Sequence, residues 1–193
     1  PLLEWALRVS QCGIASYFDS SMDGLERFDR SEGIATGMHL YDVETAGWNT
    51  HWVESRFSQA DVVLVGVSRT SKTPTSVYLA NRGLKTANVP FVPGVPLPDD
   101  LFKLTHPLVV GLTKDPRRLV EIRRQRLRLL DQDENTDYVD LDMVSKEITE
   151  ARRVFSKYDW PVINVTRKSI EETAANVIQL LSRRRGEAPG PLT

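Results

Sequence analysis

One short loop carries the residues whose types and spacing are suited to holding phosphate. A phosphate-binding loop, or P-loop, needs a first glycine, a lysine next to its end and a final serine or threonine, and Gly66, Lys72 and Thr73 supply them. Ser71 stands where the pattern normally has a second glycine. The lysine can approach the outer phosphates, and the final hydroxyl can bind a magnesium ion. The spacing favours a phosphate-binding loop, with an ordinary strand-to-helix turn as the alternative.

Such a loop works only between a strand and a helix, and the flanking residues predict both. Residues 62–65 are four consecutive branched apolar residues, which is typical of a strand covered on both faces in a parallel sheet. A helix is expected over residues 72–81, and its unpaired first N–H groups would attract an anion. The apolar residues expected along one side of this helix are Val77, Ala80 and Leu84.

Strand-like and helix-like segments continue to alternate after the loop. Strands are expected at 108–112 and 161–165. Helices are expected at about 116–130, capped by Asp115, at about 140–158, and after a capping box of Ser169 and Glu172. The first of these helices should bury Leu119, Ile122, Leu127 and Leu130. This alternation predicts an α/β fold, a P-loop-like parallel sheet with flanking helices.

The chain divides into three regions by pattern. Residues 59–185 form the expected P-loop-like domain, and residues 186–193 form a Gly- and Pro-containing tail that is expected to be disordered. Residues 1–58 show no clean helical or strand period, so we expect a divergent or truncated N-terminal segment there.

The composition is typical of a globular protein and argues against several other classes. Hydrophobic residues make up 40% and charged residues 26%, as in globular proteins, and the formal net charge of -1 gives no reason to expect nucleic acid or an anionic membrane as a partner. Cys12 is the only cysteine, so an internal disulfide and a cysteine-rich zinc site are both excluded. No apolar stretch approaches the length of a membrane span, and we expect a cytoplasmic protein.

Three longer segments together resemble one family. They are GVSRTSKTPTSVYLANRGLKTANVPFVPGVPLP, GLTKDPRRLVEIRRQRL and WPVINVTRKSIEETAANVIQLL. Their order and content are similar to the regulatory proteins of pyruvate, phosphate dikinase and phosphoenolpyruvate synthase, over residues 59–184. In that family the loop also lacks the second glycine, so the resemblance accounts for Ser71.

The resemblance implies a bifunctional enzyme, an ADP-dependent serine/threonine kinase and a phosphate-dependent phosphorylase. Its cofactors would be ADP, inorganic phosphate and Mg²⁺, and its protein substrate the dikinase or, less expected, the synthase; the sequence also permits a homodimer. Lys72 and Arg69 are the expected catalytic side chains, and Thr73 the expected metal ligand. The implied nucleotide site consists of Gly66, Val67, Ser68, Arg69, Thr70, Ser71, Lys72 and Thr73.

Two departures from the family keep other functions open. The paired aspartates that the family shows upstream of the loop strand are absent near residues 45–47, and Asn164 replaces a late aspartate. If those carboxylates contribute to catalysis, the chain would be a nucleotide-binding regulatory module without activity. A P-loop kinase of a small metabolite is the other alternative, and it would not depend on any protein target.

The other charged and titratable residues are expected to have structural or solvent-exposed positions. Asp61 is expected to face solvent in a turn, and His106 has no partner at metal-ligand spacing. A cluster of arginines is expected to be a solvated helix face, with docking to an acidic protein surface as the alternative; it comprises Arg117, Arg118, Arg123, Arg124, Arg126 and Arg128.

Overall fold

The computed structural model describes residues 41–42, 47–48 and 60–187. The chain has two compact units, Pro1–Asn49 and Thr50–Thr193. In the first unit, strand β1 (Tyr41–Asp42) pairs antiparallel with β2 (Gly47–Trp48). The predictions for residues 1–58 and for the tail after residue 187 therefore lie almost wholly outside the described residues.

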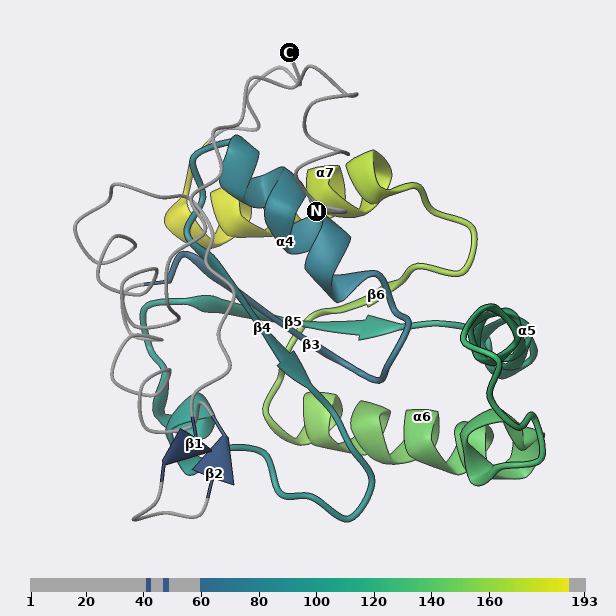
Figure 1. Cartoon of the computed structure of the whole chain (residues 1–193). Coiled ribbons are helices and arrows are strands. Elements are labelled where there is room, and N and C mark those ends of the chain that lie inside the picture. The colour runs from purple at the N-terminus through teal and green to yellow at the C-terminus, as the bar shows by residue number, and fades with distance from the viewer. Residues whose placement is uncertain (1–40, 43–46, 49–59, 188–193) are drawn as a thin grey trace. The chain divides into compact units, whose positions relative to one another are not determined.

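The second unit is built on a four-stranded parallel sheet, with the order β4-β3-β5-β6 (Figure 1). The central strands β3 and β5 are buried at every position, as their runs of branched apolar residues require. The predicted α/β fold with a parallel sheet is therefore confirmed. The strands are β3 (Val62–Gly66), β4 (Thr86–Pro90), β5 (Leu108–Thr113) and β6 (Val162–Asn164).

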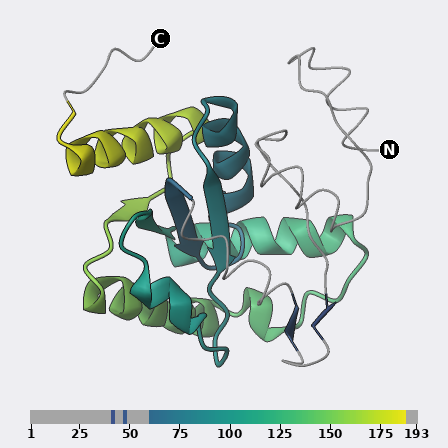
Figure 2. The ribbon, with the colours of Figure 1, turned by 90° about the vertical axis from the view of Figure 1, so that its left-hand side faces the viewer.

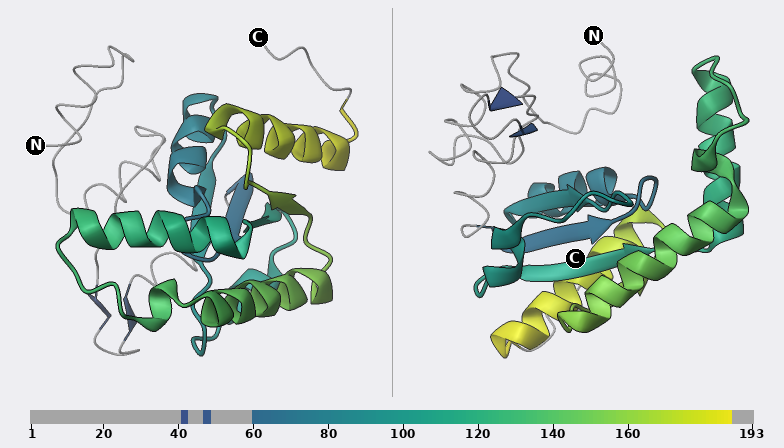
Figure 3. Two further views of the ribbon diagram at one scale, coloured as in Figure 1. Left: turned by 90° about the vertical axis from the view of Figure 1, so that its right-hand side faces the viewer. Right: turned by 90° about the horizontal axis from the view of Figure 1, so that it is seen from below.

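Helices cover both faces of this sheet. Helices α4 (Lys72–Asn81) and α7 (Ile170–Arg185) lie together on one face, and α6 (Leu141–Lys157) lies on the other, as Figures 1 and 2 show. Helix α5 (Pro116–Leu129) stands beyond the end of the sheet, where it is seen end-on in Figure 1 and along its length in Figure 3. The short 3₁₀ helices η1 (Asp99–Lys103) and η2 (Asp137–Val139) complete the unit.

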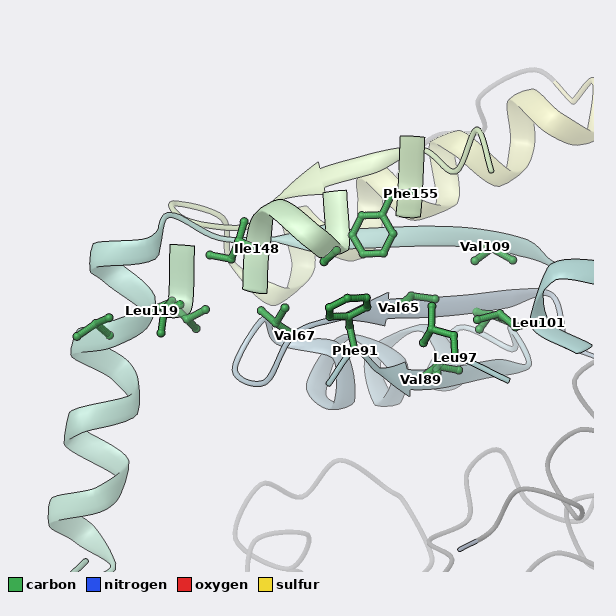
Figure 4. Close-up of a cluster of buried hydrophobic side chains, with 14 of the residues drawn as sticks. Val65, Val67, Val89, Phe91, Leu97, Leu101, Val109, Leu119, Ile148 and Phe155 are labelled. Carbon is green, nitrogen blue, oxygen red and sulfur yellow. The ribbon is translucent and has the colours of Figure 1, made fainter. Parts of the chain in front are cut away.

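The two faces of the sheet have separate apolar clusters. Figure 4 shows the cluster beneath α6, where the Phe155 ring lies over the sheet. Gly111 in β5 makes this contact possible, because a Cβ atom there would lie 2.4 Å from the Phe155 ring. On the opposite face, Leu79 of α4 and Val177 of α7 pack against β3 and β5.

The helix boundaries follow the predicted capping residues closely. The side chain of Asp115 accepts a hydrogen bond from the Arg118 N–H at 3.1 Å and begins α5. Ser169 and Glu172 form the predicted reciprocal capping box of α7. The helix predicted over residues 72–81 has those bounds in the structure.

One predicted burial assignment is wrong, because Leu130 is 47% exposed, and Ile122 is only partly buried. On α4, the side expected to be apolar faces inward only in part, because Ala80 is buried but Val77 is 42% exposed. The buried face of this helix is partly polar, with Thr75 and Ser76 beside Leu79 and Ala80.

Asp61 is also not a free solvent-facing turn residue. Its carboxylate accepts a hydrogen bond from the Lys85 N–H at 2.9 Å and pairs with Arg185. These contacts connect the start of β3 to the residue before β4 and to the last turn of α7, so Asp61 holds the ends of three elements together.

Candidate functional site

The predicted phosphate-binding loop begins where β3 ends, at the carboxyl edge of the sheet. A Cβ atom on Gly66 would lie 2.6 Å from the carbonyl oxygen of Leu112 and 2.9 Å from Thr70 Oγ1. The first position of the loop therefore requires glycine for space. This requirement gives a physical reason for the first glycine of the sequence pattern.

Two non-glycine residues of the loop adopt left-handed backbone conformations. Arg69 has φ of 70° and Ser71 has φ of 62°. Glycine adopts this region without steric cost, whereas other residues are strained there. Ser71 thus keeps the backbone conformation that the missing second glycine would favour, and the loop retains its turn despite the change of residue type.

The loop is closed by hydrogen bonds onto a single carbonyl group. Thr70 Oγ1 donates to the Val67 carbonyl at 2.9 Å, and Lys72 Nζ donates to the same oxygen at 2.8 Å. Lys72 is only 8% exposed, and burial lowers its pKa to about 8, while Glu147 raises and Arg123 lowers that pKa to smaller extents. An anion at Lys72 would relieve this unfavourable burial of charge.

The start of α4 offers backbone donors to the same place. The Thr75 N–H donates to the Ser71 carbonyl at 3.1 Å, so the N–H groups of Lys72 and Thr73 come before this first helical bond. Pro74 has no N–H to lose. Free amides at the positive end of a helix favour an anion there.

A buried ion pair supports the loop from behind. Arg123 of α5, 1% exposed, donates to both carboxylate oxygens of Glu147 of α6 at 2.8 and 3.0 Å. The same guanidinium donates to the Tyr138 carbonyl at 3.1 Å and, through a long bond of 3.4 Å, to the Ser68 carbonyl. The Tyr138 hydroxyl in turn lies 3.1 Å from Ser68 Oγ. This network joins α5, α6 and η2 to the loop.

Arg123 corrects the interpretation of the arginine cluster as a solvated face. The other five arginines of the cluster are exposed, but Arg123 lies within the structure. It is four residues from both Leu119 and Leu127, which are buried. That helical spacing is the signal that could have identified Arg123 as an inward-facing residue.

A hollow of about 980 Å³ lies in front of the loop. It opens at the carboxyl ends of β3 and β5, between which the chain order of the sheet reverses, and such switch points are where open α/β sheets bind ligands. Its lining residues are Ser68, Arg69, Ser71, Lys72, Thr73, Pro74, Asn88, Pro90, Lys114, Ile122, Arg126, Leu127, Leu130, Gln132, Thr136 and Tyr138.

The charge of this lining has one sign. Arg69, Lys72, Lys114 and Arg126 contribute four cationic side chains, and no aspartate or glutamate is among the described residues that line the hollow. An apolar part, which includes Leu127 and the half-exposed Leu130, lies on α5 and just after it. A ligand with an anionic end and a less polar end would match this arrangement.

The structure brings most of the predicted site residues together. Ser68, Arg69, Ser71, Lys72 and Thr73 line the hollow, whereas Gly66, Val67 and Thr70 are buried and shape the loop. The sequence reasoning missed Lys114, Arg126 and Tyr138. Lys114 stands directly after a buried strand and before a helix cap, which places it at the carboxyl edge of a parallel sheet but does not show which loop it lies beside.

The residues present fit magnesium only as an ion that arrives with a phosphate chain. Thr73 is exposed and lines the hollow, so its hydroxyl is available as one ligand. Within the described part of the chain, no group of three or more His, Cys, Asp or Glu side chains could hold a metal. Mg²⁺ commonly keeps several waters and binds through substrate phosphates, which such a site allows.

Two other expectations concern the rest of the domain. The Nδ1 atom of His106 lies 3.2 Å from the Ala60 carbonyl, which is a structural contact. Among residues 60–187, the structure contains no helix with the length and apolar character needed to cross a membrane.

Comparison with known proteins identifies relatives of the chain. Residues 53–178 match the Kinase/pyrophosphorylase family, and residues 4–73 match a PBP superfamily domain. A pyruvate, phosphate dikinase regulatory protein of Paramagnetospirillum magneticum is 62% identical over 194 residues, which cover 94% of this chain and 62% of that protein. Proteins with the same name from Caulobacter vibrioides and Maricaulis maris are 59% and 57% identical over 67% of this chain.

This chain is shorter than those relatives. The aligned regions span 62%, 41% and 46% of the three proteins' own lengths. The family match nevertheless contains the whole loop, β3 through β6 and the first half of α7. The chain therefore belongs to the Kinase/pyrophosphorylase family.

Proposed function

We propose that the chain is an ADP-dependent serine/threonine kinase and phosphate-dependent phosphorylase that regulates pyruvate, phosphate dikinase. The observation that carries this proposal is the hollow in front of the loop, with four cations and no carboxylate in its described lining. The matching family and the names of the relatives support the choice of reaction and target. Phosphoenolpyruvate synthase is the alternative protein substrate.

In the kinase direction, a threonine hydroxyl oxygen of the dikinase attacks the β-phosphorus of ADP. The bond between that phosphorus and the oxygen bridging to the α-phosphate breaks, AMP leaves, and the hydroxyl proton passes to water or a base. In the phosphorylase direction, an oxygen of inorganic phosphate attacks the phosphothreonine phosphorus. The threonine oxygen leaves and takes a proton, and the product is pyrophosphate.

Both directions require neutralisation of a phosphate chain, which the loop can supply. Lys72 Nζ would exchange the Val67 carbonyl for a phosphate oxygen, and the backbone amides at the start of α4 would hold a second oxygen. Arg69, exposed at the tip of the loop, would contact the group in transfer. Magnesium bound at Thr73 would supply further positive charge. The nucleoside would lie toward the apolar part on α5.

The proposal includes a cellular compartment and an oligomeric state. We place the protein in the cytoplasm with its protein substrate, and a homodimer as its assembled form. Size-exclusion chromatography with light scattering tests the second point, because a mass of one chain, 21.8 kDa, would contradict it.

A binding module without catalytic activity is the second candidate. It is favoured by the lining of the hollow, in which no described residue offers a carboxylate base for the threonine hydroxyl. At the end of β6, Asn164 accepts hydrogen bonds from the backbone and side chain of Thr166 at 3.0 and 2.5 Å, so it orders the turn there. The module would bind ADP but transfer nothing.

The deciding experiment incubates the chain with dikinase phosphorylated on its catalytic histidine and with ADP labelled in the β-phosphate. We expect label on a dikinase threonine, release of AMP and loss of dikinase activity. Lys72→Met should abolish transfer, whereas Lys146→Met, an exposed lysine on α6, should not. No label despite measurable ADP binding would establish the binding module. Label on a small metabolite without dikinase would establish a metabolite kinase.

A further inference from the structure

Lys114 is a buried cation that the loop motif does not include. It follows the last residue of β5, is 7% exposed and lines the hollow in front of the loop. Among the described residues, the buried cations are Lys72, Lys114 and Arg123. Lys72 donates to the Val67 carbonyl and Arg123 pairs with Glu147.

The ammonium group of Lys114 has no hydrogen bond or ion pair with any residue in the described part of the chain. The adjacent carboxylate, Asp115, forms no ion pair with it; that side chain caps α5 by accepting from the Arg118 N–H. Burial lowers the pKa of Lys114, and the nearby Arg118 lowers it further. The side chain of Lys114 is mostly covered, but its ammonium group is open to the hollow, so an anion that enters the hollow can supply the partner that the protein does not.

The sheet register places Lys114 beside the phosphate-binding loop. Gly66 of β3 is paired with Leu112 of β5, so Ser68 and Lys114 each lie two residues beyond that pair. Neighbouring strands are about 4.8 Å apart, and the crevice between these two is the switch point of the sheet. The backbone after Lys114 is held in place, because the Asp115 N–H donates to Thr166 Oγ1 at 2.8 Å.

We propose that Lys114 is a second phosphate-binding lysine, which holds one phosphate group of a diphosphate while Lys72 and the loop hold the neighbouring group. This role of Lys114 rests on the proposed function and adds a contact from a different strand. Two cations on opposite sides of the crevice match a ligand with two adjacent phosphates better than a ligand with a single phosphate. The hollow therefore selects diphosphates, as free pyrophosphate or as part of a nucleotide, over single phosphates.

Lys114→Met tests this role, with Lys146→Met on α6 as an exposed control. Calorimetric titrations with pyrophosphate, phosphate, ADP and AMP would be run on both variants and on the unmodified chain. Hydrogen bonds to charged groups are strong enough that we expect Lys114→Met to lose about tenfold or more in affinity for pyrophosphate and ADP. Affinity for phosphate and AMP should fall much less. Equal losses for free pyrophosphate and ADP would show that Lys114 contacts the phosphates and not the nucleoside.

The thermal unfolding of the same variant separates binding from folding. Methionine keeps the buried stem of the side chain and removes an ammonium that pairs with no described residue, so Lys114→Met should melt at about the same temperature as the unmodified chain. Pyrophosphate and ADP affinities that match the unmodified chain would overturn the role of Lys114, and if Lys72→Met still lost them, the proposed function would stand. A lower melting temperature with equal losses for all four probes would also overturn it. If the unmodified chain bound none of the four, both the role and the proposed function would fail.

Discussion

Replacing Glu147 by glutamine removes the negative partner of Arg123 and keeps the shape of the side chain. Glu147 is 8% exposed and Arg123 is 1% exposed, and two hydrogen bonds of 2.8 and 3.0 Å join them. Removing one member of a buried ion pair destabilises a protein by about 3–5 kcal/mol, because the other charge is left unpaired. We expect Glu147→Gln to lower the free energy of unfolding by about 3 kcal/mol or more.

The same substitution should reach the phosphate site. Glu147 raises the pKa of Lys72, whereas Arg123 lowers it. Without the carboxylate, the Lys72 pKa should fall below its value of about 8, and less of the lysine would be charged near that pH. ADP should therefore bind more weakly to folded Glu147→Gln than to the folded unmodified chain at pH 8.

Urea unfolding followed by far-UV circular dichroism measures the effect on stability. The set comprises the unmodified chain, Glu147→Gln, the double variant Arg123→Met/Glu147→Met, and Glu150→Gln as an exposed control on the same helix. The double variant should recover most of the loss, because apolar residues of similar volume can replace a buried ion pair. A loss of less than about 1 kcal/mol for Glu147→Gln, or a double variant no more stable than the single one, would refute the reasoning.

Three further predictions concern the loop and a helix cap. Gly66→Ala places a Cβ atom 2.6 Å from the Leu112 carbonyl, so it should cost about 1–3 kcal/mol in urea unfolding and weaken ADP binding in calorimetry. The ADP association constant should fall as pH rises through about 8, because the free protein loses the Lys72 proton there. Ser169→Ala breaks the capping box with Glu172, so it should cost about 1 kcal/mol and leave ADP binding unchanged.

Each of these has a clear contrary result. Full ADP affinity in Gly66→Ala would show that the loop geometry is not needed for binding. A flat pH profile from about 7 to about 9.5 would separate Lys72 from the ligand, since the second ionisation of a phosphate ester has its pKa near 6, below this range. Unchanged stability in Ser169→Ala would refute the capping contribution.

The pKa of Lys72 also predicts how stability depends on pH. The unfolding free energy should rise between about pH 8 and 10.5, where the unfolded chain binds the Lys72 proton and the folded chain does not.

Local sequence rules predicted the elements of the domain well. The strand before the loop, the helix over residues 72–81 and the caps at Asp115 and Ser169 all depend on residues close together in the chain. Burial was harder to predict. The apolar Leu130 is half-exposed beside the hollow, while the charged Arg123 is buried, because its partner Glu147 is 24 residues away and the pairing depends on how α5 and α6 meet.

Part of the candidate site could likewise be predicted from the sequence and part could not. The loop could be found from spacing, since its residues are contiguous. Lys114 could not be assigned to the site from spacing alone, because only the parallel pairing of β3 with β5 places it beside Ser68. The left-handed conformation of Ser71 was likewise hidden, and it explains in physical terms why the pattern normally has glycine at this position.

The most direct test of the account locates ADP on the chain. Amide NMR spectra of the isotope-labelled protein would be recorded during titration with ADP and, separately, with AMP. The largest ADP-induced shifts should fall on residues 66–73 and on Lys114, and they should be absent in Lys72→Met. Shifts concentrated elsewhere, or none at ADP concentrations that saturate the calorimetric signal, would contradict the claim that this loop holds the phosphate chain.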